Sequence, residues 1–363
     1  MQSVAPAIPP RAERIQLLEK VGQSLLKMPY STWNFGDSTG FEGILESGRV
    51  LKDAQYLAFA HGWMRSWATR AEPYRRLDCT APGMAMVQVA EETGDEVLLA
   101  ALIPLARYLM SRPVDRGILD TWESLCLIPP YGGEELPPRE AELLANPPAG
   151  TCVDCLHFDP PFFTALGKAT NNSEFTEVGV NQALAYIAAL QRDNGIFDHF
   201  FLRDEPGTFG PAWGRGQGWS MLGMLDVLKN ISTDHPARAA ITDAVLKQIH
   251  AMVKLQRPDG RWWCVLDSPR SGEEGSTAAF MAAGFARAIK LGIISDTQLR
   301  PAFQAALGGA IDDADENGYL KNVTAAVMAS TRKSHYEFTP RGFLVPWGQG
   351  ALAMAICDAE DLL

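Results

Sequence analysis

Positive charge, long apolar runs and paired cysteines are all scarce in this sequence of 363 residues. The formal net charge is −11, which argues against a nucleic acid or an anionic membrane as partner, since both bind basic surfaces. No stretch reaches the roughly 18 apolar residues of a membrane span, and residues 1–10 lack the basic flank and apolar core of a secretion signal. We therefore expect a cytoplasmic protein that binds neither nucleic acid nor membrane.

The six cysteines do not follow the spacing of a disulfide framework. Only Cys152-Val-Asp-Cys155 has the spacing of a metal or redox pair. A zinc site would need two further ligands at matching spacing, and a redox pair would need a βαβ setting that this chain lacks. We expect free, partly buried thiols, no metal site and no other cofactor.

Helical periodicity and helix-ending residues recur along the whole chain. Apolar residues spaced by four from Ile241 to Val253, for example, predict a helix over 235–257. The complete pattern predicts twelve helices, near residues 10–28, 39–50, 54–71, 80–93, 95–112, 153–169, 172–191, 216–230, 235–257, 275–292, 295–314 and 347–361.

The connections between these helices alternate in length. Every second join is short, as in a hairpin of two helices, whereas the others are longer, above all those at 113–152 and 315–346. This alternation places every long loop on one face of the molecule. Since loops carry most functional residues, we expect the active site on that face.

A glycine turn followed by an apolar or aromatic pair recurs after several of the helices that precede long loops. The four copies are Arg116-Gly117-Ile118-Leu119, Asn194-Gly195-Ile196-Phe197, Asp259-Gly260-Arg261-Trp262 and Asn317-Gly318-Tyr319-Leu320. Glycine permits the positive φ of a tight turn, and the residues after it suit a short strand. Six helical hairpins closed into a ring account for both repeats, so we predict an all-α (α/α)6 toroid: a single domain over 1–363, with a loop-face insertion at about 113–152. An open solenoid is the alternative, although solenoids usually keep a tighter period.

A polar or aromatic cluster lies at the start of every second helix. The clusters are Trp33-Asn-Phe-Gly36, Leu77-Asp78-Cys-Thr-Ala-Pro-Gly83, Cys152-Val-Asp154-Cys155, Trp213-Gly-Arg215-Gly-Gln-Gly-Trp219, Glu274-Gly-Ser-Thr277 and Pro346-Trp347-Gly-Gln-Gly350. In a closed ring these points converge on a central funnel. Acids and tryptophans in one funnel suit a sugar, whose ring faces stack on indole while its hydroxyls form hydrogen bonds.

Asp78 and Asp154 occupy equivalent positions before two of these helices. An aspartate there is often an N-cap, so a structural role is one interpretation. Paired carboxylates, however, are the usual apparatus for breaking glycosidic bonds, and we predict that both are catalytic. A helix N-terminus favours the charged carboxylate, so burial or repulsion between the two acids would have to keep the general acid protonated.

Arg215 and three tryptophans each permit two interpretations. Arg215 lies among glycines, where its guanidinium could bind a ligand carboxylate through two parallel hydrogen bonds. An ion pair with Glu274 is the structural alternative. Trp213, Trp219 and Trp347 are either stacking platforms for a sugar or core residues wedged between helices.

Five motifs in this order resemble the unsaturated rhamnogalacturonyl hydrolases, glycoside hydrolase family 105, which are related to the unsaturated glucuronyl hydrolases. The motifs are Val153–Phe162, Gly195–His199, Trp213–Trp219, Glu274–Ser276 and Trp347–Gly350. The similarity extends from about Trp33 to the C-terminus. It implies an (α/α)6 toroid without a metal ion.

The resemblance also implies a reaction at a terminal 4,5-unsaturated uronic acid left by a polysaccharide lyase. An aspartate matching Asp154 protonates C4 of the enol-ether double bond and helps water to add at C5; the hemiketal then opens and releases the remaining sugar. Asp78 matches a second aspartate that positions hydroxyls or water. The residues expected to contact the unsaturated sugar are His199, Arg215, Trp213, Trp219, Trp33 and Trp347.

The sequence departs from the family pattern at two points. Family members often carry a histidine before the catalytic aspartate, but residues 113–150 contain none. His157 is a candidate substitute, with a role in the core as the alternative. The segment Glu274-Gly-Ser276 also stands where Glu-Thr-Ser is common. We therefore expect sugar recognition at this edge of the pocket to differ.

Three other functions are compatible with a toroid of this kind. A conventional inverting glycosidase would use Asp78 and Asp154 as acid and base. A sugar epimerase would need paired basic groups, usually histidines, and few of the six histidines fall on the loop face. A non-catalytic protein that binds oligosaccharides would keep the tryptophans alone.

Overall fold

The computed structural model describes residues 4–30, 35–70, 81–121 and 125–363. Within these residues the twelve predicted helices are present. Six form an inner ring: α2 (Asp37–Leu51), α4 (Gly83–Thr93), α7 (Cys155–Ala169), α9 (Gly214–Asn230), α11 (Gly275–Lys290) and α14 (Pro346–Ala359). Six lie outside it: α1 (Arg11–Leu26), α3 (Ala54–Ala68), α5 (Glu96–Met110), α8 (Ser173–Leu190), α10 (Arg238–Leu255) and α12 (Asp296–Asp312).

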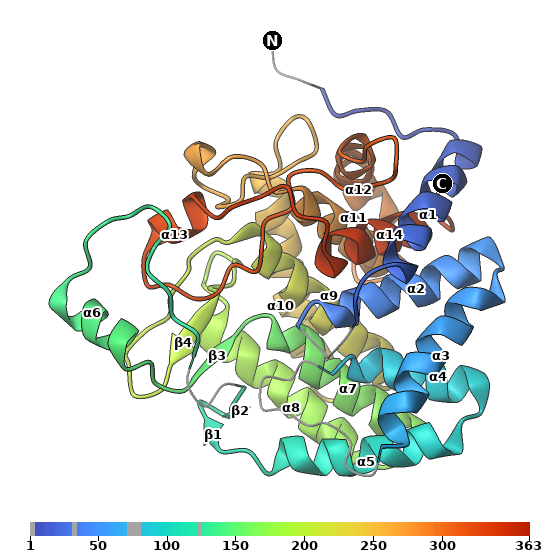
Figure 1. Ribbon diagram of the computed structural model, residues 1–363, viewed down its shortest axis with the longest axis horizontal. Helices are drawn as coiled ribbons and strands as arrows, with labels where there is room; N and C mark the ends of the chain where they lie inside the picture. Colours follow the sequence, from blue (N-terminus) through green and yellow to red (C-terminus); the bar gives the residue numbers. More distant parts are fainter. Residues whose placement is uncertain (1–3, 31–34, 71–80, 122–124) are drawn as a thin grey trace.

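The inner helices close into a ring. Each contacts the next in chain order, and α14 returns to pack against α2, while each outer helix packs on one or two inner ones (Figure 1). Nearly every residue of α9, α11 and α14 is buried, as expected for helices surrounded on all sides. The predicted all-α (α/α)6 toroid is therefore confirmed.

Glycines allow the inner helices to approach closely. A Cβ atom on Gly43 of α2 would lie 2.8 Å from the Cα atom of Gly350 on α14. A Cβ atom on Gly218 of α9 would overlap the ring of Phe280 on α11. Gly350 thus allows two inner helices to approach backbone to backbone, and Gly218 makes room for an aromatic ring of the neighbouring helix.

The connections alternate as predicted. Short joins at 52–53, 94–95, 170–172, 231–237 and 291–295 link each inner helix to the next outer one. Long loops at 27–36, 69–82, 111–154, 191–213, 256–274 and 313–345 lead back from an outer helix to the N-terminus of an inner one. The described parts of these long loops therefore lie around the N-terminal end of the inner ring, which is the loop face.

The four glycine turns have the predicted backbone conformation and are held by glutamine side chains. The φ angles of Gly117, Gly195, Gly260 and Gly318 lie between 80° and 89°. The side chain of Gln349 on α14 accepts a hydrogen bond from Leu320 N (2.8 Å) and donates one to Gly318 O (2.9 Å). Gln217 on α9 binds both backbone groups of Phe197 in the same manner. The central glutamine of each Gly-Gln-Gly segment thus joins an inner helix to a loop turn.

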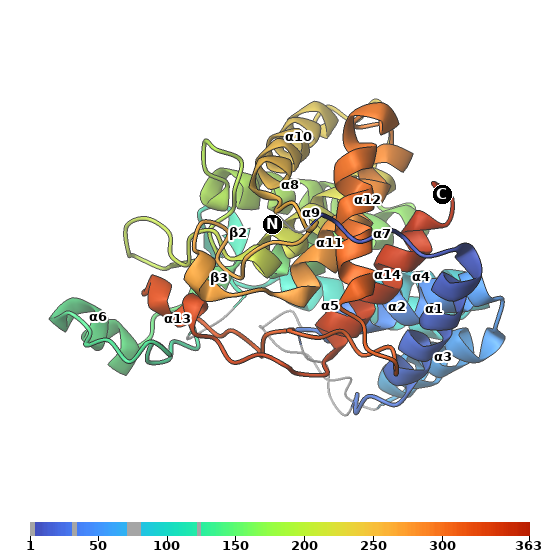
Figure 2. The same ribbon diagram turned by 90° about the horizontal axis from the view of Figure 1, so that it is seen from above.

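The long loops contain short elements that the twelve-helix prediction omitted. They are β1 (Val114–Asp115), β2 (Ile118–Leu119), α6 (Pro138–Ala145), β3 (Gly150–Cys152), β4 (Phe200–Leu202), a 3-10 turn at Pro269–Ser271 and α13 (Lys333–Glu337). Figure 2 shows α6 projecting from the body of the ring. Ion pairs of Arg139 with Glu205 and of Arg332 with Glu140 tie α6 to neighbouring loops. Elements this short carry little periodicity of their own, so their stability depends on such tertiary contacts.

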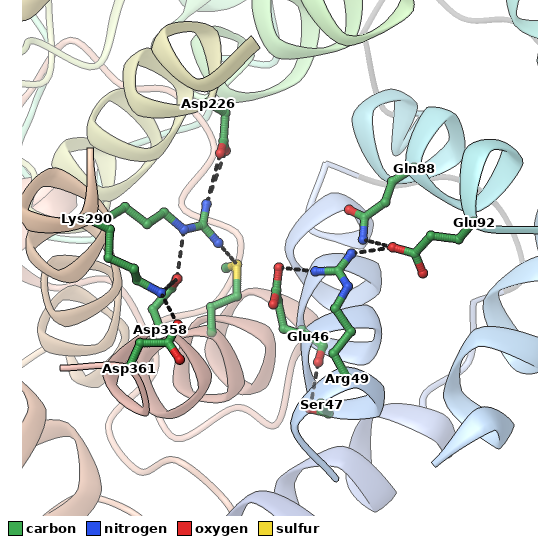
Figure 3. Close-up of polar contacts among 12 residues, drawn as sticks. Glu46, Ser47, Arg49, Gln88, Glu92, Asp226, Lys290, Asp358 and Asp361 are labelled. Carbon is green, nitrogen blue, oxygen red and sulfur yellow. Dashed lines mark hydrogen bonds and ion pairs between the residues drawn. The ribbon is translucent and has the colours of Figure 1, made fainter. Parts of the chain in front are cut away.

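Paired charges occupy the C-terminal end of the inner ring (Figure 3). Arg287 on α11 donates to Asp226 on α9 (3.2 Å) and to Asp358 on α14 (2.7 Å). Lys290 also donates to Asp358, at 3.0 Å. These ion pairs link three adjacent inner helices at the end that lies away from the long loops. None of the helices in the described parts of the chain has the length and apolar composition needed to cross a bilayer.

Candidate active site

Asp154 lies immediately before α7, at the end of the 111–154 loop. Its backbone is already helical, with φ −54° and ψ −37°, and its side chain forms no capping hydrogen bond. The residue is 8% exposed, and its Oδ2 atom has no hydrogen-bond partner among the described residues. The N-cap interpretation is therefore wrong for Asp154, whose carboxylate remains available to a ligand.

His199 lies directly before β4 and faces Asp154. Its Nε2 atom is 3.4 Å from Asp154 Oδ2, and its carbonyl oxygen accepts a hydrogen bond from Val153 N at 2.7 Å. Strands β3 and β4 pair antiparallel, with Cys152 opposite Phe200. This pairing brings two residues that are 45 positions apart in the sequence (199 − 154) into one site.

A cavity on the loop face contains both side chains. Its lining is mostly apolar and comes from four loops and the start of α7: Phe35, Leu125, Cys126, Cys152, Asp154, Cys155, Phe158, His199, Trp213, Val327, Met328 and Ala329. The ring of Trp213 lies 4.5 Å from that of His199, centroid to centroid. Three of the predicted site residues, Asp154, His199 and Trp213, therefore share one cavity. An apolar wall with a few polar groups is typical of ligand pockets.

Arg215 is fully buried behind the wall of the cavity. Its guanidinium donates to Glu274 Oε1 (3.1 Å), to Thr324 Oγ1 and to Ala325 O (2.9 Å), and it lies 4.9 Å from the ring of Trp213. The ion pair with Glu274 that the sequence left as an alternative is thus present. Arg215 supports Trp213, and its expected contact with the sugar stays a prediction.

Two of the predicted tryptophans pack behind the cavity lining. Trp219 is completely buried, with ring-centroid distances of 5.4 Å to His157 and 4.9 Å to Phe280. Trp347 donates from Nε1 to Thr324 O (3.1 Å) and stacks on Phe35 at 4.8 Å. Since Phe35 lines the cavity, Trp347 is separated from it by one ring. Substrate contacts for both tryptophans stay predictions.

Asp78 and Trp33 lie outside the described residues. The second acid of the predicted pair, and the tryptophan of the first cluster, are therefore not placed relative to Asp154. Their expected roles stay predictions.

His157 points into the ring and away from the cavity lining. Its Nε2 atom is 3.1 Å from Glu42 Oε1, and within the described residues Glu42, His157 and Asp226 form the one group whose ligand atoms all lie within 4.8 Å. One imidazole and two carboxylates can bind a divalent ion. However, Arg287 already donates to both oxygens of Asp226 at 3.2 Å, so this group belongs to the ion-pair network. His157 is therefore no substitute for the missing family histidine.

Several residues of the site were not found from the sequence. Tyr336, whose hydroxyl is 2.7 Å from His199 Nδ1, comes from α13 in the 313–345 loop. Other lining residues that the sequence did not reveal are Leu125, Cys126 and 327–329, whereas Phe35 and Phe158 lie within a predicted cluster and a family motif without being singled out. Most of these positions lie in irregular loops, where no periodicity marks the side chains that turn inward.

A ring of helical hairpins with a buried acid in an apolar loop-face cavity is an arrangement typical of an enzyme active site. Comparison with known families specifies this class further. The profile of Glycosyl Hydrolase Family 88 matches residues 12–363, and the chain belongs to that family. It is therefore a glycoside hydrolase.

Among curated proteins, the chain is similar to the unsaturated rhamnogalacturonyl hydrolase YesR of Bacillus subtilis, with 22% identity over 94% of this chain and 93% of the relative. Among solved structures it resembles a possible family 105 member from Salmonella enterica (TM-score 0.82, 19% identity, 97% of this chain and 94% of that chain). The unsaturated glucuronyl hydrolase of Bacillus sp. GL1 is also similar (TM-score 0.71, 18% identity, 97% of each chain). The expected relationship to these enzymes is confirmed.

Proposed function

We propose that this enzyme removes a terminal 4,5-unsaturated uronic acid from lyase-generated oligosaccharides by hydrating the C4=C5 double bond. The observation that supports it most directly is the Asp154 carboxylate, which lines the cavity and whose buried Oδ2 has no hydrogen-bond partner among the described residues. The name of the Bacillus subtilis relative and the match to Glycosyl Hydrolase Family 88 agree with this substrate class.

Asp154 is the proposed general acid and base. In the first step its carboxylic acid gives a proton to C4, and the positive charge that develops at C5 is shared with the ring oxygen. Water then adds at C5 and returns a proton to the carboxylate, so the group ends as it began. The hemiketal opens by breaking the bond between C5 and the ring oxygen, which leaves a hemiacetal at C1. Collapse of this hemiacetal to an aldehyde releases the next sugar. One buried acid in an apolar cavity can perform both proton transfers.

The cavity wall favours a particular kind of neighbouring sugar. Leu125, Val327 and Met328 offer apolar contacts, and no lysine or arginine is present among the described lining residues. Such a wall suits the methyl group of a 6-deoxy sugar such as rhamnose better than an acidic or sulfated group. The cytoplasmic location expected from the sequence stays a prediction.

A panel of unsaturated disaccharides tests the proposal. The partner sugar would be rhamnose, another neutral hexose or an amino sugar, and consumption would be followed by loss of the ultraviolet absorbance of the conjugated double bond. We expect at least one disaccharide to be consumed, with rhamnose preferred. Cleavage of a saturated glycoside when none of the panel reacts would instead indicate a conventional glycosidase.

Asp154→Asn tests the assigned residue. We expect turnover to fall about 10²- to 10⁴-fold, because general acid catalysis contributes that much, while substrate binding persists. Asp53→Asn is the matched control, since Asp53 caps α3 through Gln55 N at 2.9 Å and asparagine caps equally well. A protein that binds the disaccharides but shows no turnover before mutation would be a carbohydrate-binding protein.

A further inference from the structure

Tyr336 is a buried tyrosine that touches the site without lining the cavity. Its side chain is fully enclosed, and its hydroxyl lies 2.7 Å from His199 Nδ1 and 3.4 Å from Ser330 O. Gly210 makes room for this contact: a Cβ atom there would lie 2.5 Å from the Tyr336 hydroxyl and 2.6 Å from His199 Cβ. The absence of a side chain at Gly210 therefore leaves the space in which Tyr336 and His199 meet.

The two distances from the hydroxyl indicate where its proton points. A phenol donates hydrogen bonds well, and of its two acceptors the imidazole nitrogen is closer by 0.7 Å (3.4 − 2.7). Burial raises the pKa of Tyr336 well above its ordinary value, so the hydroxyl keeps its proton. A ring nitrogen that accepts this hydrogen bond uses its lone pair, so Nδ1 carries no hydrogen of its own. The ring of His199 then bears its hydrogen on Nε2, the atom that faces Asp154 Oδ2 at 3.4 Å.

We propose that Tyr336 is a positioning residue, which donates to His199 Nδ1 and so keeps the Nε2–H of that ring directed at Asp154. The proposal rests on the hydration chemistry given above. As Asp154 transfers its proton to C4, negative charge develops on a carboxylate whose Oδ2 has no other donor among the described residues. A donor aimed at that charge stabilises the transition state more than the ground state. The 3.4 Å contact is long, as expected before substrate closes the site.

Other titratable groups around this pair leave the assignment to Tyr336. Asp198 pairs with Arg192 at 2.7 Å, so its charge is balanced. Burial raises the pKa of Cys152 and keeps its thiol neutral. Burial also lowers the pKa of His335 to about 4, so that ring is neutral at ordinary pH. Among the described residues, Tyr336 is thus the group that sets the proton position on His199.

Nitrogen NMR of the wild-type protein tests the arrangement without any substrate. We expect His199 to carry its proton on Nε2, with Nδ1 accepting a hydrogen bond. A proton on Nδ1, or a mixture of tautomers, would overturn the proposal. Because this measurement needs no turnover, it stands or fails separately from the proposed reaction.

Tyr336→Phe tests the consequence for catalysis. We expect kcat to fall about tenfold with a smaller change in KM, because a donor that acts in the transition state is no longer held in place. The alkaline limb of the pH–rate profile should move to higher pH, since a hydrogen-bond donor favours the ionised carboxylate and its loss lets the acid keep its proton longer.

Tyr56→Phe is the control, because it removes the hydroxyl of an equally buried tyrosine on α3. It should leave kcat and the alkaline limb unchanged. A Tyr336→Phe enzyme that loses activity evenly at all pH values, with no movement of the limb, would show that Tyr336 only supports the fold. If this variant does not fold, the wild-type NMR measurement decides.

Discussion

The buried aspartates at the two ends of the inner ring differ in their hydrogen-bond partners. At the C-terminal end, Asp358 accepts hydrogen bonds from Arg287 and Lys290 (Figure 3), and their charges outweigh burial to hold its pKa below the ordinary value. At the loop face, the Oδ2 atom of Asp154 has no hydrogen-bond partner in the described chain. Ion pairs such as these hold helices together, whereas a buried carboxylate oxygen without a hydrogen-bond partner is a feature of reactive sites.

At the loop face, a place at the N-terminus of an inner helix does not alone determine the role of an acidic residue. Glu274 and Asp154 both stand at the N-cap of an inner helix. Glu274 accepts hydrogen bonds from Thr277 N (2.9 Å) and Arg215 Nη1 (3.1 Å), so its carboxylate is saturated by protein groups. Asp154 occupies the same kind of position but faces an apolar cavity. The surroundings, supplied by distant loops, make one acid structural and leave the other free to react.

The largest effect on stability should come from Arg287→Met. This change leaves Asp226 and Asp358 without their shared cation in a buried setting, so we expect a loss of about 3–5 kcal/mol in the free energy of unfolding. Denaturant titration measures it. Arg107→Met, which removes an exposed partner of Glu174, is the control and should cause no measurable change. Equal losses of unfolding free energy in the two variants would show that the buried ion pairs at the C-terminal end contribute no more than an exposed one.

His335 provides the second largest effect, as a dependence of stability on pH. Its pKa is lowered by burial from 6.5 to about 4, so its contribution is complete above pH 6.5 and is lost as pH falls toward 4, because the unfolded chain binds the proton first. The loss should be about 3 kcal/mol across this window. In His335→Gln the curve of unfolding free energy against pH should be flatter by that amount. His250→Gln, at an exposed position, should keep the wild-type slope.

A smaller loss should follow from Gln349→Leu. The change removes the hydrogen bonds of this side chain to Leu320 N, Gly318 O and Ser24 Oγ. We expect about 2 kcal/mol less stability, mainly because the two backbone groups lose their partner. Thermal unfolding would measure this change. Gln88→Leu, which breaks only an exposed contact with Glu92, is the control and should have little effect. A Gln349→Leu protein as stable as the control would show that the turn needs no anchoring by the ring.

The smallest change in stability should belong to Asp154→Asn, the variant expected to lose most activity. Asn is uncharged and Oδ2 has no hydrogen-bond partner in the described residues, so the free energy of unfolding should stay constant or rise by up to about 1 kcal/mol. Asp358→Asn is the matched variant at the opposite end, and it should be destabilising because it weakens two ion pairs. A loss in Asp154→Asn as large as in Asp358→Asn would contradict the comparison between the ends.

The toroid could be predicted from the sequence because its signals are local and repeated. Each long helix has its own periodicity, and turns such as Gly195 and Gly318 mark where an outer helix ends. The short helices α6 and α13 could not be found in this way. Their stability depends on ion pairs such as Arg332 with Glu140, which join residues nearly two hundred positions apart in the sequence.

The site could be predicted only in part. Asp154 and Trp213 flank helix starts, so ring closure brings them together. Arg215 and Trp219 lie two and six residues further along the chain than Trp213, within α9, and both side chains are buried in the core. Tyr336 could not be inferred, because the fold of a long loop decides where its hydroxyl points.

The β3–β4 pairing has a consequence for how this enzyme can be altered. It links Asp154 and His199 through the Val153–His199 backbone contact, so the reacting groups move as one piece. The opposite wall of the cavity is held by a separate β-bridge between Leu127 and Ala329. We expect that redesign of this wall can change which oligosaccharides are accepted while the spacing of the acid and its histidine is preserved.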